Sequence, residues 1–102
     1  MGRKSKEAIE IEFSKAMNQA QELADVAKEM AMLANNLNGR ELALLEKAWK
    51  GSNADAIGIR WRELITDMID TARDLENISR SIRATADLIY KAEKAAVMMA
   101  YY

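Results

Sequence analysis

The stretch LEKAWKGSNADAI, residues 45–57, decides the fold because it separates two long periodic segments. Gly51 can take the left-handed conformation that ends a helix, since it has no Cβ atom. Ser52 can cap the next helix, and Asp55 three residues later completes a capping-box pattern. The stretch therefore predicts a turn at 49–53 between two helices.

The segment before this turn has the periodicity of one helix face. Its apolar residues recur at alternating steps of four and three: Ile9, Phe13, Ala16, Ala20, Leu23, Ala27, Met30, Ala34 and Leu37. The pattern resumes one residue late, at Leu42, Leu45 and Trp49. A straight helix drifts by about 20° per heptad, so one skipped residue restores the face. We predict one helix over about 6–48, strained near Asn38-Gly39.

The segment after the turn repeats the same spacing for longer. Its members are Ile57, Trp61, Leu64, Met68, Thr71, Leu75, Ile78, Ile82, Thr85, Ile89, Ala92, Ala96 and Met99. Two long helices joined by a short turn pack antiparallel. We therefore predict an all-α chain, a single antiparallel two-helix hairpin over 1–102, with its second helix at about 54–99.

Both apolar faces are wider than one helix–helix contact can cover. Flanking apolar residues are Met17, Val26, Leu33 and Leu44 on the first segment, and Ile65, Ile69, Ala72 and Ala86 on the second. Helices in bundles bury about three positions in seven, so we predict a homodimer or heterodimer of hairpins that forms a four-helix bundle. The predicted helix–helix interface comprises Phe13, Leu23, Met30, Leu37, Leu45, Trp61, Leu64, Met68, Leu75, Ile82 and Ile89.

The composition argues against catalysis and against nucleic-acid binding. The chain has no Cys and no His, which removes the commonest general base and metal ligand at neutral pH. Fifteen basic and sixteen acidic residues give a net charge of -1, so no excess positive charge favours polyanions. We expect neither an enzyme nor a metal or cofactor site.

The tripeptide Trp49-Lys50-Gly51 lies near the middle of the chain, between the two predicted helices. In these features the whole chain resembles the WXG100 (ESAT-6-like) family of bacterial proteins, helical hairpins of this length with Trp-x-Gly at the turn. The resemblance implies export by a type VII secretion system, through an FtsK/SpoIIIE-type ATPase and commonly as a folded dimer. It makes Trp49 and Gly51 the turn and secretion motif.

The family's C-terminal signal, often Tyr-x-x-x-Asp or Glu, is only partly matched. Lys94 stands four residues after Tyr90, and the nearest acid, Glu93, stands three after it. Either this tail is a divergent signal, with Tyr90, Glu93, Tyr101 and Tyr102 as candidate residues, or a partner supplies the signal. The apolar end of the tail is expected to contact a partner's hairpin, then the ATPase, then a membrane surface, in that order of preference.

The basic N-terminus is followed by Glu7, Glu10 and Glu12 rather than by an apolar run, unlike a signal peptide. We expect a secreted or surface protein that folds in the cytoplasm and lacks a cleavable leader, whose partners include a related hairpin or a larger toxin. A membrane-active amphipathic hairpin and a cytoplasmic four-helix adaptor stay open as alternatives. The balanced charge weighs against both.

Overall fold

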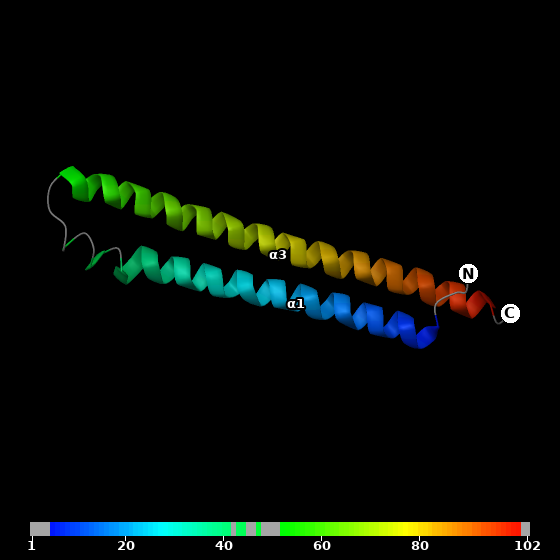
Figure 1. Ribbon diagram of the computed structural model, residues 1–102. Helices are drawn as coiled ribbons and strands as arrows, with labels where there is room; N and C mark the ends of the chain where they lie inside the picture. The colour runs from blue at the N-terminus through cyan, green and yellow to red at the C-terminus, as the bar shows by residue number, and fades with distance from the viewer. Residues whose placement is uncertain (1–4, 42, 45–46, 48–51, 101–102) are drawn as a thin grey trace. The chain divides into compact units, whose positions relative to one another are not determined.

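The structure is a computed structural model that describes residues 5–41, 43–44, 47 and 52–100. Its elements are α1 (Lys6–Asn36), the π-helical turn η1 (Leu37–Glu41) and α3 (Ser52–Ala100), as Figure 1 shows. Ser5 caps α1, since its Oγ accepts a hydrogen bond from the Ala8 N–H at 3.1 Å. Every other residue in the described ranges is helical, so the all-α prediction is confirmed there.

The chain forms two compact units, and each takes one part from α1 and one from α3. Unit 1 comprises Met1–Ala24 and Glu76–Tyr102, and unit 2 comprises Asp25–Leu75. In unit 1 the blue start of α1 lies beside the orange end of α3, and in unit 2 the end of α1 lies beside the start of α3 (Figure 1). The helices thus pack against each other with opposite directions in each unit, which confirms the hairpin-like arrangement.

Small residues at seven-residue spacing occupy five of the seven buried positions among the described residues. They are Ala20, Ala27 and Ala34 on α1, and Ala72 and Ser79 on α3. The Ser79 hydroxyl donates a hydrogen bond of 2.7 Å to the carbonyl oxygen of Ala20. Because a serine side chain is so short, this bond requires the two helix backbones of unit 1 to approach closely.

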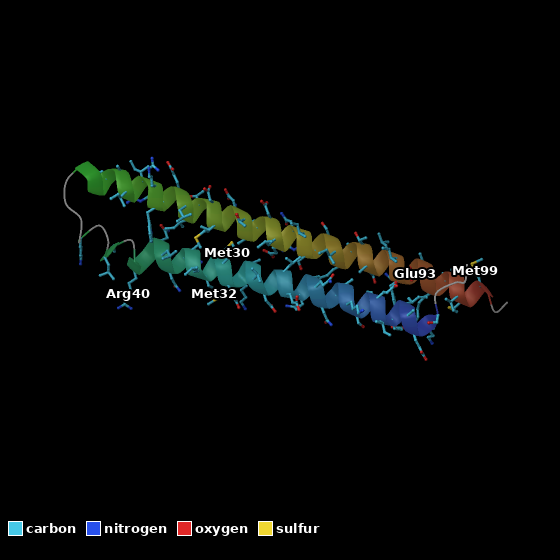
Figure 2. The ribbon with its side chains drawn as sticks, in the orientation of Figure 1. Met30, Met32, Arg40, Glu93 and Met99 are labelled. Carbon is cyan, nitrogen blue, oxygen red and sulfur yellow. The ribbon has the colours of Figure 1, made fainter. Side chains whose placement is uncertain are left out.

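The stripe of α1 that packs on α3 is the predicted one. Four members are buried, namely Ile9, Ala20, Ala27 and Ala34, and the other five are half-buried. In unit 2, Met30 points toward α3, whereas Met32, which is 57% exposed, points away (Figure 2). Because α1 carries a single apolar stripe, its periodicity allows only one choice of contact residues.

Alternate members of the α3 stripe are displaced by one position from the prediction, whereas Trp61, Met68, Leu75 and Ile82 are half-buried. The displaced members follow the predicted ones by one residue: Ile65, Ala72 and Ser79 are buried, and Ala86 is half-buried. The predicted members Leu64, Thr71, Ile78 and Thr85 are exposed. Small side chains allow closer helix packing than Leu or Ile does, so the larger residues lie at the edge.

The one-residue slip in the α1 pattern coincides with η1, which interrupts the α-helix predicted over 6–48. A π-helical turn holds one extra residue. It therefore accounts for the one-residue slip in the pattern, for which helix drift was the explanation expected from the sequence. The Trp61 Nε1–H points to the Leu37 carbonyl oxygen at 3.5 Å, a long hydrogen bond, at the start of this turn. The expected strain near Asn38-Gly39 thus falls within a π-helical turn.

Candidate functional site

One edge of the α1–α3 contact in unit 1 is closed by polar side chains, and we call it the polar face. The Tyr90 hydroxyl donates to Glu10 Oε1 at 2.8 Å, and Lys94 Nζ lies 3.0 Å from the same oxygen. Two turns further along, Arg83 donates to Gln21 Oε1 at 2.6 Å. These bonds link the two helices directly at this edge.

The Tyr90 ring adds apolar contact to the same cluster. Its centroid lies 4.4 Å from that of Phe13, in a tilted arrangement, and Lys94 Nζ lies 5.2 Å from the Tyr90 centroid. Hydrogen bonds from Lys94 and then from Tyr90 lower the pKa of the Glu10 carboxyl. The bond to Glu10 likewise raises the pKa of Lys94. Tyr90, a candidate signal residue, is therefore half-buried against α1.

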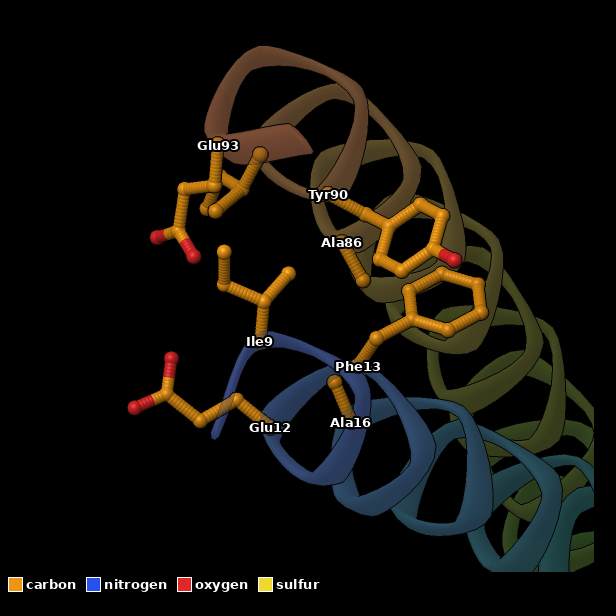
Figure 3. Close-up of a pocket in the computed structure, with 8 residues that line it drawn as sticks. Ile9, Glu12, Phe13, Ala16, Ala86, Tyr90 and Glu93 are labelled. Atoms are coloured by element: carbon orange, nitrogen blue, oxygen red, sulfur yellow. The ribbon is translucent and has the colours of Figure 1, made fainter. Parts of the chain in front are cut away.

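The opposite edge of unit 1, the open face, is apolar and incompletely covered. Ile78 and Ile89 of α3 are 48% and 51% exposed there. A groove of about 280 Å³ lies between the helices, lined by Ile9, Glu12, Phe13, Ala16, Ala86, Ile89, Tyr90 and Glu93. Figure 3 shows the Phe13 and Tyr90 rings together on one side, and the Glu12 and Glu93 carboxylates on the other side, flanking Ile9.

Unit 2 has an open face at the same heptad positions. Val26 and Leu33 of α1 follow Glu12 by two and three heptads, and they are 47% and 51% exposed. Ile57 and Leu64 of α3 precede Ile78 by three and two heptads, and they are 38% and 51% exposed. Residues at whole-heptad spacing lie at the same edge of a helix stripe, so in each unit one edge presents partly exposed aliphatic side chains.

The described end of α3 continues this apolar character. Val97 is half-buried, whereas Met98 and Met99 are 60% and 75% exposed. A second hollow, of about 310 Å³, is lined here by Ile9, Val97 and Met98 together with the lysines Lys6 and Lys94. The tail that the sequence singled out is thus partly uncovered as far as it is described.

The predicted site residues fall into three groups. Trp49, Gly51, Leu45, Tyr101 and Tyr102 lie outside the described residues. Leu64 and Ile89 lie half-exposed on the open faces, and Glu93 lines the groove. The remaining interface residues are half-buried: Phe13, Leu23, Met30, Leu37, Trp61, Met68, Leu75 and Ile82.

Two residues of the site were not anticipated. Ser79 is polar, so a search for apolar periodicity passes over it, although its seven-residue spacing from Ala72 and Ala86 was visible. Glu10 and its partner Tyr90 are 80 positions apart, and no local signal joins them. Cross-helix polar pairs of this kind depend on the register of the two helices, which the periodicity alone does not set.

The open faces leave partly exposed aliphatic side chains and an apolar-floored groove at the surface of the described residues. Over the described ranges, no group of acidic side chains is placed to hold a metal ion, and no helix is both long and apolar enough to cross a bilayer. No protein family, curated protein or solved structure matches the chain.

Proposed function

We propose that the chain works by docking its open faces against a second helical hairpin, forming a four-helix bundle. The observation that carries this proposal is the placement of residues by size. Among the described residues, four of the six buried hydrophobic side chains are alanine, whereas the larger aliphatic side chains of the open faces are 38% to 51% exposed, namely Val26, Leu33, Ile57, Leu64, Ile78 and Ile89. The centre of the contact within the chain is made mostly of small residues, and these aliphatic side chains at its edge are available to another molecule.

The energetics favour the same conclusion. Burying one Val, Leu or Ile side chain that was exposed contributes about 1.5–3 kcal/mol. A pair of helices with a largely alanine core collects little of this free energy by itself, and isolated helices are marginal in water. A second hairpin on Val26, Leu33, Leu64 and Ile89 would supply burial that the monomer lacks.

We further propose that this docking serves type VII secretion, with the chain exported by such a system or targeting a partner to it. The support is the combination of a helical hairpin with Trp49-Lys50-Gly51 in the connection between its helices, as in the WXG100 family that the sequence resembles. The secretion ATPase would bind Trp49 while the bundle stays folded.

The docking proposal is tested by the mass of the purified protein, from light scattering coupled to size exclusion at several concentrations. A particle of about twice the 11.5 kDa chain mass is expected for a self-paired bundle. A monomer that acquires a stable partner on co-expression with related hairpins also supports docking. A fully helical monomer that pairs with no hairpin would contradict it.

The secretion proposal is tested in a bacterium that has a type VII system, with its ATPase gene intact or deleted. We expect the chain in the culture medium only when the ATPase is present, and we expect Trp49→Ala to reduce export while circular dichroism shows most of the helix content retained. A matched Trp61→Phe variant should still be exported. Release of the chain from the strain that lacks the ATPase would count against this role, and so would unfolding of the Trp49→Ala variant.

A further inference from the structure

We infer that the open face of unit 2 pairs with the same face of a second copy of the chain, with the two α3 helices antiparallel. The pairing rests on the docking function proposed above, for which it names the partner. The face carries two aliphatic side chains on each helix, Val26 and Leu33 on α1 and Ile57 and Leu64 on α3, each 38% to 51% exposed. A contact between hairpins needs an apolar centre of this kind.

Charged side chains flank this patch, and all of them are exposed. The charged residues three or four positions from the four aliphatic residues are Glu22, Glu29, Arg60 and Asp67. Residues at these spacings share one side of a helix. Asp74 follows Asp67 by seven residues on α3, and exposed Arg40 lies in η1 beyond Leu33. Both signs of charge therefore occur along the face, and their order decides which partner fits.

On α3 the sign of the charge changes at Leu64. Arg60 lies four residues before Leu64, and Asp67 lies three residues after it. Seven residues at 1.5 Å each place the two charged residues about 10 Å apart along the helix. That spacing is too long for the pairing of residues three or four apart that helices support. Each charge is therefore suited to a partner on another chain.

On α1 the order of the charges is reversed along the chain. Glu29 lies four residues before Leu33, and Arg40 lies seven residues after it. In unit 2 the end of α1 lies beside the start of α3 (Figure 1), so the helices run in opposite directions. Both arginines therefore lie toward the connection between the helices, and Glu29 and Asp67 lie toward the other end of the face.

A two-fold axis that crosses the helices at the level of Leu64 brings opposite charges together. It reverses the second copy end for end, so Arg60 meets Asp67 of the second copy, and Glu29 comes level with its Arg40. An axis parallel to the helices would bring like charges together instead, because it keeps the two arginine ends side by side. The order of charges therefore favours an identical chain in the antiparallel arrangement.

The test is a charge-reversal cycle on the dimer, measured by sedimentation equilibrium of Arg60→Glu, Asp67→Arg and the double variant. A two-fold dimer contains the pair twice, so each single variant should weaken self-association about threefold to tenfold at low salt. The double variant should recover to within about twofold of the parent, and high salt should shrink all the differences. An equimolar mixture of the two single variants should associate more tightly than either variant alone.

The apolar centre is tested by Leu64→Asp, which should weaken self-association about tenfold or more. Ile59→Asp is the matched control, because Ile59 is 56% exposed but lies on another side of the helix, five residues before Leu64. Arg73→Glu is the control for the charge reversals, since exposed Arg73 lies nine residues after Leu64, half a turn around the helix. Both controls should stay within about twofold of the parent, and circular dichroism will check the helix content of every variant.

Several outcomes would overturn the inference while leaving helix docking in place. These are single reversals that leave a dimeric parent unchanged, as the parallel arrangement requires, or a double variant no stronger than the single ones. Losses in the controls equal to those of the test variants would do the same. A parent chain that stays monomeric would also overturn it, and docking would then depend on a different hairpin.

Discussion

The two edges of the helix contact in unit 1 are built from the same two helices yet differ in almost every physical respect. At the polar face, Tyr90 and Lys94 of α3 bond to Glu10 of α1, and Arg83 bonds to Gln21. At the open face, Ile89 stands half-exposed beside a groove with an apolar floor. One edge suits contact with water, and the other suits burial.

For the docking that we propose, this difference favours one side for the partner. Exposed hydrogen bonds and ion pairs add little stability, but covering the polar face would require these groups to be desolvated without new partners. Covering the aliphatic part of the open face, beside the Glu12 and Glu93 carboxylates, removes apolar surface from water and leaves the bonds of the polar face intact. In the proposed bundle, this asymmetry favours a second hairpin on the open face rather than on the polar face.

The largest effect should come from disturbing the contact that both edges share. Ala20 is fully buried, and its carbonyl accepts the Ser79 hydrogen bond, so Ala20→Leu would force the backbones apart. Overpacking of this kind costs about 1–3 kcal/mol, which should be visible as a lower urea midpoint. Asn18→Leu, at an exposed position of the same helix, should leave the midpoint nearly unchanged. Equal midpoints for Ala20→Leu and the parent would show that the helices are not closely packed here.

An intermediate effect should come from placing a charge on the open face alone. Ile89→Asp puts a carboxylate in the groove beside Glu93, and we expect association with a second hairpin to weaken by roughly tenfold or more. Leu88→Asp makes the same change one residue earlier, where the side chain is 69% exposed, and should shift association by less than about twofold. Sedimentation of the two variants checks this, and equal losses would remove the distinction between the faces.

The two helices also differ in how far their packing followed from the sequence. On α1 the alternation of fours and threes included all four buried residues, Ile9, Ala20, Ala27 and Ala34, because the helix carries one continuous apolar stripe. On α3 two overlapping stripes compete, since Leu64 stands next to Ile65 and Ile78 next to Ser79. Apolar periodicity cannot choose between them, because the choice depends on side-chain size and on how closely the backbones approach.

The candidate site followed from the sequence only in outline. A surplus of apolar residues indicated a partner, and Leu64 and Ile89 were among the predicted interface residues. Which edge of the contact is polar and which is open could not be predicted from the sequence. It depends on pairs such as Glu10 with Tyr90, which only the helix register brings together. The slip after Leu37 was visible in the pattern, but nothing in the spacing distinguished helix drift from an inserted residue in η1.

The smallest effect should come from the polar face, and its pH dependence has a defined sign. The pKa of Glu10 is lowered from its ordinary 4.5 in the folded chain, so its stabilising contribution is present above that value and disappears as pH falls through the lowered pKa. The pKa of Lys94 is raised from 10.5, so its contribution is present below 10.5 and disappears as pH rises through the raised pKa. Both contributions should hold between about pH 5 and 10.

The order of the causes gives a sharper measurement on Glu10. Lys94 is the larger cause of the lowered pKa and Tyr90 the smaller, so Lys94→Met should raise the Glu10 pKa more than Tyr90→Phe does, as read from the carboxyl carbon shift in NMR titrations. Lys91→Met serves as the control, because Lys91 pairs with Asp87 at 2.9 Å and should leave Glu10 nearly unaffected. If Lys91→Met moved Glu10 as far as Lys94→Met did, a general field of positive charge would replace the specific bonds as the cause. The polar face would then no longer be defined by contacts between the helices.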